Sequence, residues 1–511
     1  MALVVALVVV ACHQEPVNPN SNLSLERFTG LKEQQYALNS HRVRESLEHI
    51  LHEDRDSSRA DFHVRRYYRQ GGRLVWIDRY GTDSRADTLV NWLRRCLPTM
   101  GFSEKAFGLG QIESDLQRMR SLTFDASNTV NAVAARIEYG LSKAYLRFAM
   151  GQRFGFVDPK DILNHLDVLS RDTLGRPTGY ARLFDVDMQF PGKGYAGVAL
   201  RKVAHDSLSE YLAECQPTDT LYKRFSRELA MASGARRDII LCNMERRRWR
   251  ERECPQAGQL YVLVNVAAYH LWAVSPDTIV DMRVGCGALG TKTPLLTSHI
   301  THMDVNPEWI IPMSIVHKDI VRHAGDPSYF HRHGYYIAER KTGKRMDLSA
   351  VTQEMLKSGQ YRVTQPGGAG NALGRIVFRF PNAFSVFLHD TSTRAFFTSD
   401  NRGVSHGCVR VEKPFELARF LLDTDDEWLL DKLRITMGLA PQTEQGMAYM
   451  ESEDRPQHPQ FMKRLNIRAR VPLFITYYTL YPDLQSGQMK TYPDVYRYDK
   501  ALLKALRWFR V

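Results

Sequence analysis

The pattern of apolar residues changes near Gly234, and this change limits what the chain can fold into. Before it, apolar side chains recur at helical spacing, as on the face formed by Leu89, Trp92, Leu93, Cys96 and Leu97. After it, residues 259–274 (QLYVLVNVAAYHLWAV) are β-branched and aromatic, which predicts a strand, a turn at 275–277 and a second strand over 278–284. We therefore expect an α+β chain, mainly helical first and β-rich afterwards.

The domain organisation follows from this change of pattern. A length of 511 residues corresponds to several domains of roughly 100–200 residues each. A stretch rich in His, Tyr, Lys and Arg, at about 314–363, separates the first strands from later strand-like runs, and we interpret it as an inserted lid. The predicted parts are a helical scaffold domain over 23–235, a β-rich domain with the lid over 236–499, and a C-terminal helix over 500–511 that could dock on the scaffold.

The N-terminal residues resemble an export signal. Ala2 to Ala11 (ALVVALVVVA) is too short for a bilayer span of about 20 residues, but it suits the apolar part of a signal peptide. The residues that end at Cys12 resemble a bacterial lipobox, in which cleavage before the Cys leaves it to carry lipid. We predict a signal peptide over 1–11, a polar tether over 12–22, and a periplasmic protein lipid-anchored to the outer membrane of a Gram-negative bacterium. An uncleaved or trimmed hydrophobic N-terminus is the alternative.

The net charge of +12 favours anionic partners. Apolar residues make up 43% and charged residues 25% of the chain, which excludes wholesale disorder. The densest basic cluster lies within Arg246 to Arg252, and we interpret it as a solvated helix face, with a polyanion site as the alternative. No nucleic-acid-binding motif accompanies it, so nucleic acid is not an expected partner.

The residues that point to chemistry lie between Phe387 and Pro414 (FLHDTSTRAFFTSDNRGVSHGCVRVEKP). A cysteine nucleophile reacts as its thiolate, which is scarce at neutral pH when the pKa is about 8.5. An imidazole such as that of His389 can take the thiol proton of Cys408, and backbone N–H groups can hold the oxyanion of an attacked carbonyl. Gly407 allows a tight bend before Cys408. A metal-binding or chance Cys–His pair is the alternative, although no HExxH or CxxC pair occurs.

The spacing between His389 and the motif around Cys408 is more specific than the presence of one His and one Cys. His389, fifteen intervening residues and then Ser-His-Gly-Cys resembles the active-site signature of the L,D-transpeptidases with a YkuD-like catalytic domain. The HGCVR variant resembles the larger periplasmic subgroup that crosslinks peptidoglycan and has a helical scaffold domain. Asn306-Pro307 with Trp309 resembles the segment before that subgroup's substrate-capping insertion, and residues 371–374 (NALG) resemble the entry to the His strand. The resemblance covers residues 236–440 strongly and the helical half loosely.

This resemblance implies a role for each matching residue. Cys408 would be the nucleophile that releases D-Ala from a donor tetrapeptide stem, and His389 would be the base. His406 and Gly407 would shape the oxyanion side with the Cys408 N–H. An acceptor stem would resolve the thioester, and no metal or cofactor is required. Carbapenem-type inhibitors are expected to acylate Cys408.

The resemblance also implies residues around the substrate. Ser405 would hold the loop, and Arg410 would support the loop or meet a substrate carboxylate. Asn371, Trp309 and Phe387 could line the cleft, with core packing as the alternative for each. His406 could likewise be structural.

Two rival functions remain open at this point. An L,D-carboxypeptidase would use the same residues with water in place of the acceptor amine. A non-catalytic, lipid-anchored cell-wall scaffold is the other, and the intact His389 and Cys408 argue against it. The chain also departs from the larger members, because helical sequence runs from Leu221 almost directly into Arg236 and leaves no room for a separate peptidoglycan-binding module.

Overall fold

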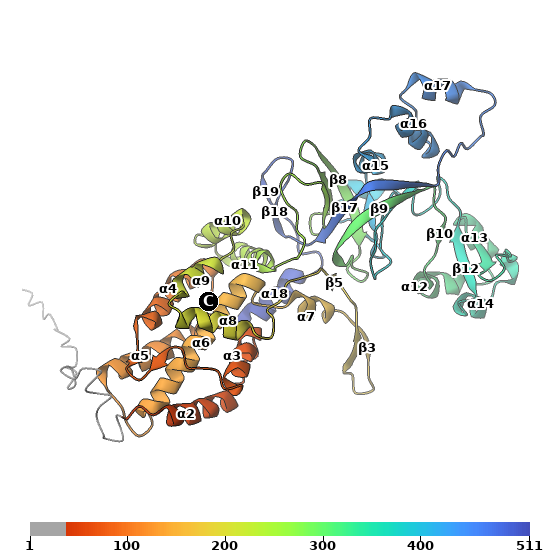
Figure 1. Cartoon of the computed structure of the whole chain (residues 1–511). Helices are drawn as coiled ribbons and strands as arrows, with labels where there is room; N and C mark the ends of the chain where they lie inside the picture. Colours follow the sequence, from red (N-terminus) through yellow and green to blue (C-terminus); the bar gives the residue numbers. More distant parts are fainter. Residues whose placement is uncertain (1–36, 511) are drawn as a thin grey trace, which may run out of the picture. The chain divides into compact units, whose positions relative to one another are not determined.

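The computed structural model describes residues 37–510, except for the side chain of Arg468. The predicted signal peptide, the tether and Cys12 lie outside the described residues. The chain divides into two compact units (Figure 1). Unit 1 contains the chain up to Asp158, residues Gln189–Arg250 and the residues from Leu502; unit 2 contains Pro159–Met188 and Glu251–Ala501.

Unit 1 is helical. Its long central helix α6 (Val130–Phe154) is buried along most of its length because Ala, Leu, Tyr and Phe occupy nearly all of its faces. Around α6 pack α2 (Ser40–Glu53), α3 (Arg59–Arg69), α4 (Ser84–Met100), α5 (Leu109–Ser121), α8 (Tyr195–Ala204), α9 (Leu208–Glu214), α10 (Thr220–Leu229) and α11 (Gly234–Arg248). The two-residue strands β1 (Ile77–Asp78) and β2 (Gly81–Thr82) form a small hairpin. Cys96 is half-buried against the core, as its helical spacing predicts.

A buried carboxylate organises the centre of unit 1. Glu138 of α6 is fully buried and accepts hydrogen bonds from the backbone N–H groups of Val75, Trp76 and Ile77 and from the Tyr68 hydroxyl. The segment before β1 has no other secondary structure, so Glu138 supplies the acceptors that its backbone needs.

The end of the chain adds an aromatic contact to the same core. Helix α18 (Tyr498–Ala505) continues into a 3-10 turn over Leu506–Trp508. The Phe509 ring centre lies 5.0 Å from that of Phe156 and 5.5 Å from that of Phe102. The Ser103 N–H also donates to the Phe509 carbonyl at 2.7 Å.

The prediction that the basic cluster at the end of α11 is a solvated face was wrong for two of its residues, whereas Arg250 and Arg252 are exposed. Arg246 and Arg248 are only 3% and 2% exposed. Arg248 donates to Glu245, to Gln152 and to the Tyr222 hydroxyl, at 3.0–3.1 Å. A buried guanidinium must be paired in this way, since its desolvation is costly, and so this part of the cluster cannot bind an external polyanion.

Unit 2 is built on one large sheet. Its strands follow the order β13-β14-β16-β8-β7-β6-β17-β9-β5, and β15 pairs with β8. Because β13 also pairs with β9, the strands from β13 round to β9 form a closed ring, as in a barrel. The bounds are β5 (Phe184–Asp185), β6 (Tyr261–Asn265), β7 (His270–Val274), β8 (Ile279–Gly287), β9 (Leu295–Val305), β13 (Ile376–Arg379), β14 (Leu388–His389), β15 (Gly403–Ser405), β16 (Val409–Val411) and β17 (Arg464–Thr476).

Smaller elements surround this sheet. Before it come α7 (Pro159–Asn164) and a hairpin of β3 (Val168–Arg171) and β4 (Pro177–Tyr180). After β16, Pro414 begins α15 (Pro414–Leu422), followed by α16 (Glu427–Thr436) and α17 (Glu444–Glu451). A second hairpin, of β18 (Leu480–Pro482) and β19 (Met489–Thr491), precedes α18.

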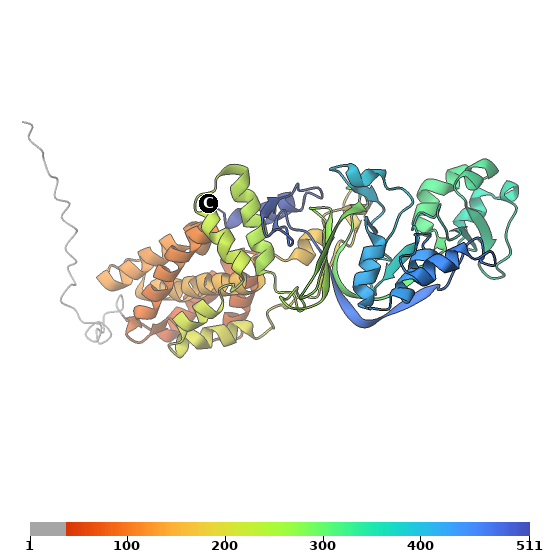
Figure 2. The same ribbon diagram turned by 90° about the horizontal axis from the view of Figure 1, so that it is seen from above.

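The insertion forms a subdomain with its own core (Figure 2). Its sheet has the order β10-β12-β11, with β10 at Trp309–Ile310, β11 at Tyr336–Glu339 and β12 at Tyr361–Gln365. Short helices α12 (Met313–Ile315), α13 (Pro327–Arg332) and α14 (Gln353–Lys357) and a π-helical turn over Val316–Ile320 cover it. Since Phe330, Ile337 and Val363 are buried within it, the insertion is a packed body and not a loop.

The α+β class is confirmed, and one strand prediction was wrong. Residues 259–274 form a hairpin of β6 and β7, not one strand. The turn lies at Val266–Tyr269, where Tyr269 has a positive φ of 49°. None of the described helices combines the length and apolar character needed to cross a bilayer.

Candidate active site

Two parallel strands bring the predicted base next to the strand of the predicted nucleophile. Strands β14 and β16 pair with Leu388 opposite Val409 and His389 opposite Arg410. Side chains alternate between the faces of a sheet, so the fully buried Leu388 and Val409 share one face and His389 and Arg410 share the other. Cys408 stands two residues before Arg410 and therefore belongs to the face of His389.

The loop before Cys408 is held by Ser405. Its Oγ accepts a hydrogen bond from the Gly407 N–H at 3.1 Å and donates to the Cys408 carbonyl at 2.5 Å. The Ser405 carbonyl in turn accepts from the Ala288 N–H and the Thr291 hydroxyl. Gly407 has a φ of +117°, a conformation that residues with a Cβ rarely adopt. The sequence SHGC thus encodes a bend whose shape is set by a serine and a glycine.

One backbone donor at this bend remains unused. The Gly407 N–H is taken by Ser405, whereas the Cys408 N–H donates to no acceptor within residues 37–510. A free N–H on the nucleophile itself is a common part of an oxyanion hole.

The imidazole of His389 is uncharged at neutral pH. It is only 4% exposed, and its Nδ1 donates to the Asp390 carbonyl at 2.5 Å, so the other ring nitrogen carries a lone pair. Burial, followed by the charge of Arg410, lowers the pKa of His389 to about 4, although the carbonyls of Asp390 and Leu373 oppose this. His389 can therefore accept a proton.

Cys408 rests as a thiol. Its side chain is half-buried, and this burial raises the pKa of the thiol, although a backbone N–H of Phe387 and the charges of Arg410 and Arg379 act in the opposite direction. A neutral thiol and a neutral imidazole on the same face do not form an ion pair before a substrate binds.

Arg410 brings a positive charge to this face. Its Nε is buried and has no hydrogen-bond partner among the described residues, and its guanidinium carbon lies 5.7 Å from the Phe396 ring centre. A partly desolvated guanidinium without a carboxylate is suited to receive one from a ligand.

His406 is turned toward the insertion. Its Nε2 lies 3.4 Å from Oδ2 of Asp319, and the two side chains are 46% and 35% exposed. The imidazole that precedes Gly407 therefore contacts the insertion. Its predicted role at the oxyanion side stays a prediction.

Asn371 and Trp309 lie at the base of the insertion. Asn371 is 1% exposed, and its Nδ2 donates to the carbonyls of Pro307, Gln365 and Pro366, which ties the two ends of the insertion together. Trp309 packs against the insertion core. These contacts are structural, and substrate contact by either residue stays a prediction.

Phe387 contacts Arg379, a residue that was not predicted from the sequence to belong to the site. The Arg379 guanidinium carbon lies 4.3 Å from the Phe387 ring centre, and Arg379 also donates to Asp304 at 2.8 Å. In the β13–β14 register Val377 pairs with His389, so alternation puts Arg379 on the His389 face. The alternation was visible in the sequence, but the pairing partner was not.

Unit 2 thus combines a closed ring of strands with a cysteine that precedes β16 and a histidine on the adjacent strand β14, an arrangement suited to cysteine chemistry. Residues 259–435 match the family model of the L,D-transpeptidase catalytic domain, YkuD, and residues 63–229 match the model of a Scaffold domain. These residues are therefore similar to the catalytic domain of the L,D-transpeptidases, preceded by a region similar to a Scaffold domain.

One curated relative agrees with this assignment. It is a Haemophilus influenzae protein named "Putative L,D-transpeptidase", 30% identical over 251 residues. The alignment covers 48% of this chain and 46% of the relative, so this chain spans less than half the length of the relative that it matches.

Proposed function

We propose that this protein is a peptidoglycan L,D-transpeptidase that crosslinks stem peptides through a thioester on Cys408. The observation that carries the proposal is the strand register that sets His389 beside Arg410, on the face of Cys408. The family match over residues 259–435 supports the reaction class.

The first half-reaction consumes a donor tetrapeptide. As the Cys408 sulfur attacks the carbonyl between residues three and four, its proton passes to the free ring nitrogen of His389. The oxyanion is held by the Cys408 N–H. His389 then gives the proton to the departing amine of D-Ala, and the thioester remains.

The second half-reaction forms the crosslink. The side-chain amine of a diamino acid on an acceptor stem attacks the thioester, and His389 takes a proton from this amine. When the C–S bond breaks, the proton returns to the sulfur and Cys408 is regenerated as a thiol. Arg410, which carries no carboxylate partner among the described residues, is suited to hold a carboxylate of one stem.

Two further parts of the proposal rest on the sequence. The run that ends at Cys12 supports a lipid-anchored protein in the periplasm, at the outer membrane of a Gram-negative bacterium. The cysteine chemistry supports acylation of Cys408 by carbapenem-type inhibitors.

The test is incubation of the purified protein with tetrapeptide muropeptides, followed by mass analysis. Crosslinked dimers and an acyl adduct that disappears in Cys408→Ala are expected. Free tripeptide without dimers would identify an L,D-carboxypeptidase instead. No adduct with either tetrapeptide or carbapenem would leave a non-catalytic wall-binding protein.

A further inference from the structure

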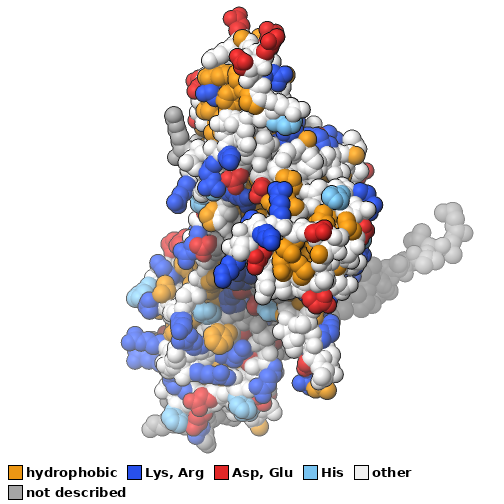
Figure 3. Space-filling model, turned by 90° about the vertical axis from the view of Figure 1, so that its right-hand side faces the viewer, with side chains coloured by type: hydrophobic (Ala, Val, Ile, Leu, Met, Phe, Trp, Pro, Cys, Tyr) orange, Lys and Arg blue, Asp and Glu red, His pale blue; other side chains and the backbone are white. Residues whose placement is uncertain are grey.

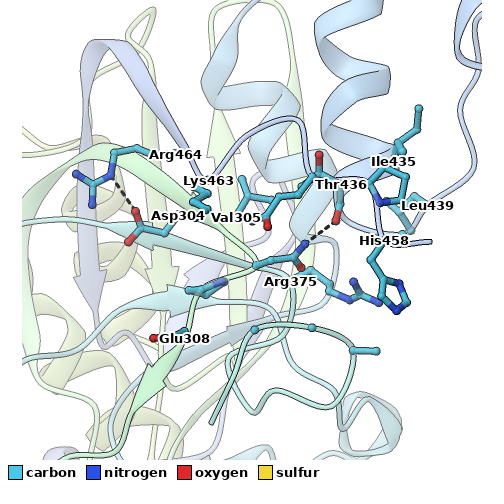
Figure 4. A pocket seen from close by; sticks show the side chains of 18 of the residues that line it. Asp304, Val305, Glu308, Arg375, Ile435, Thr436, Leu439, His458, Lys463 and Arg464 are labelled. Atoms are coloured by element: carbon cyan, nitrogen blue, oxygen red, sulfur yellow. Dashed lines mark hydrogen bonds and ion pairs between the residues drawn. The ribbon is translucent and has the colours of Figure 1, made fainter. Parts of the chain in front are cut away.

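A cavity lies in unit 2, outside the Cys408 centre (Figure 4). It has a volume of about 1100 Å³. Its walls come from the ends of β9 and β17, the base of the insertion, the end of α16 and the segment that follows α17. Ligand sites typically occupy about 300–1,000 Å³, so this cavity has room for a peptide of several residues.

The cavity is strongly basic. Five of its lining residues are cationic, namely Arg375, Arg379, Arg455, Lys463 and Arg464, whereas only Asp304 and Glu308 are acidic. Figure 3 shows Lys and Arg side chains gathered on the face between the α17 segment and the insertion.

The one acid among the strands is already neutralised. Asp304 accepts from Arg379 at 2.8 Å and from Arg464 at 3.0 Å, and these guanidinium groups lower the pKa of its carboxyl despite burial. Arg375, Arg455 and Lys463 form no ion pair with any of the described residues, although Arg455 donates to the Met450 carbonyl. Three cations thus face the cavity without carboxylates, which favours an anionic ligand.

Two glycines are among the lining residues. A Cβ on Gly367 would stand 2.2 Å from the Asn306 carbonyl oxygen, so the packing of the backbone requires a glycine there, whereas a Cβ on Gly368 would meet nothing within 4 Å. The apolar Val305, Ile435 and Leu439 line the rest. A peptide that carries carboxylates and short apolar side chains matches this combination of cationic and apolar lining residues.

Arg379 connects the cavity with the reaction centre. It lines the cavity, it stacks on Phe387, and its charge acts on the pKa of Cys408. Arg379 therefore stands between a ligand in the cavity and the sheet face that carries His389 and Cys408.

We infer that this basic cavity is an exosite that binds the carboxylates of a peptidoglycan stem peptide outside the Cys408 centre. The inference rests on the proposed function. Much of one wall, from Thr436 to Arg464, follows the residues matched by the catalytic family model, so the exosite depends on a C-terminal segment outside that match. The occupant is a stem of the donor or of the acceptor, which share this chemistry.

The test variant is Arg375→Gln/Arg455→Gln/Lys463→Gln in the full chain. Formation of the acyl-enzyme from a disaccharide tetrapeptide reports on the donor, and the rate of dimer formation against acceptor concentration reports on the acceptor. We expect the KM of one of the two stems to rise at least tenfold. Acylation by a carbapenem, which lacks a stem, should keep the wild-type rate and so verify that the variant is folded.

The matched control removes three positive charges from exposed residues of unit 2 outside the cavity, as Arg176→Gln/Arg419→Gln/Arg470→Gln. It should leave both KM values unchanged. Unchanged KM values for both stems in the cavity variant would overturn the inference. If the wild type forms no acyl-enzyme at all, the proposed function fails. The exosite is then tested by calorimetry of tetrapeptide binding to Cys408→Ala, with and without the cavity substitutions, and equal affinities would overturn the inference.

Discussion

The Nε2 of His406 and the Oδ2 of Asp319 lie 3.4 Å apart and connect the loop before Cys408 with the insertion. The contact links two separately packed parts of unit 2, because the insertion has its own core and sheet. Whatever moves the insertion therefore acts on the residue next to Gly407.

Replacing Asp319 with Asn should loosen the insertion without unfolding it. Both partners are more than a third exposed, so this contact contributes less than about 1 kcal/mol to stability. We expect faster hydrogen exchange over residues 309–365 and a change of a few fold in KM for the donor. Glu354→Gln, an exposed carboxylate of the same insertion, is the control. Identical hydrogen exchange in both variants would show that the contact between His406 and Asp319 does not hold the insertion in place.

The rate of Cys408 acylation should depend on the protonation of His389. The pKa of His389 is lowered to about 4, so the base is present above this value and is lost as the pH falls through it. We expect a level rate between about pH 5 and 8, whereas an ordinary histidine with a pKa of about 6.5 would give a midpoint there. Single-turnover acylation by a carbapenem at each pH measures this. A midpoint near 6.5 would contradict the buried, neutral base.

Gly407→Ala should disable the site with a moderate loss of stability. A residue with a Cβ is strained at φ +117°, which costs about 1–3 kcal/mol, and relief of that strain would displace the Cys408 N–H. We expect acylation to fall by at least 100-fold while the chain stays folded. Gly290→Ala is the control, because a Cβ there meets no atom within 4 Å. Thermal melting and acylation kinetics distinguish the two.

The candidate pair of His389 and Cys408 could be proposed from the sequence because its signal is local. His389 and Cys408 lie nineteen positions apart in one motif, and Ser405 and Gly407 act on the backbone of their immediate neighbours. The helical character of the first part of the chain and the β-rich character of the second could also be predicted, since each depends on the spacing of apolar residues.

What the sequence did not predict depends on long-range pairing. Arg379 reaches the site only through the register of β13 with β14, and Asp319 only through the packing of the insertion. The hairpin over 261–274 was missed because its turn, Val266 to Tyr269, contains no Gly, Asn or Pro. Arg248 was misplaced because a charged residue on a helix is normally solvated, and its buried partner Gln152 lies 96 residues away.

Loss of the Glu138 carboxylate should destabilise unit 1. In Glu138→Ala the N–H groups of Val75, Trp76 and Ile77 and the Tyr68 hydroxyl would lose their buried acceptor, at a cost of about 3 kcal/mol or more. We expect a clear drop in the denaturant midpoint of unit 1. Glu214→Ala, at an exposed ion pair with Arg153, should change it little. Equal midpoints for the two variants would show that Glu138 does not organise this core.

Two substitutions at Arg410 distinguish the effect of its positive charge from the effect of its planar guanidinium group. The charge of Arg410 lowers the pKa of His389 and also that of the Cys408 thiol. Arg410→Gln should therefore raise the midpoint of the pH–acylation profile above about 4, toward the ordinary histidine value, because the imidazolium is no longer opposed by a neighbouring cation.

Arg410→Lys keeps the charge but not the planar guanidinium that lies 5.7 Å from the Phe396 ring centre. It should retain the low midpoint and lose activity mainly through a higher KM for the stem peptide, since one ammonium cannot hold a carboxylate in bidentate fashion. Full pH profiles of kcat/KM with a carbapenem and with a tetrapeptide separate the two effects. If Arg410→Gln leaves the midpoint in place, Arg410 does not tune the base, and only its contact with substrate remains to explain its position opposite His389.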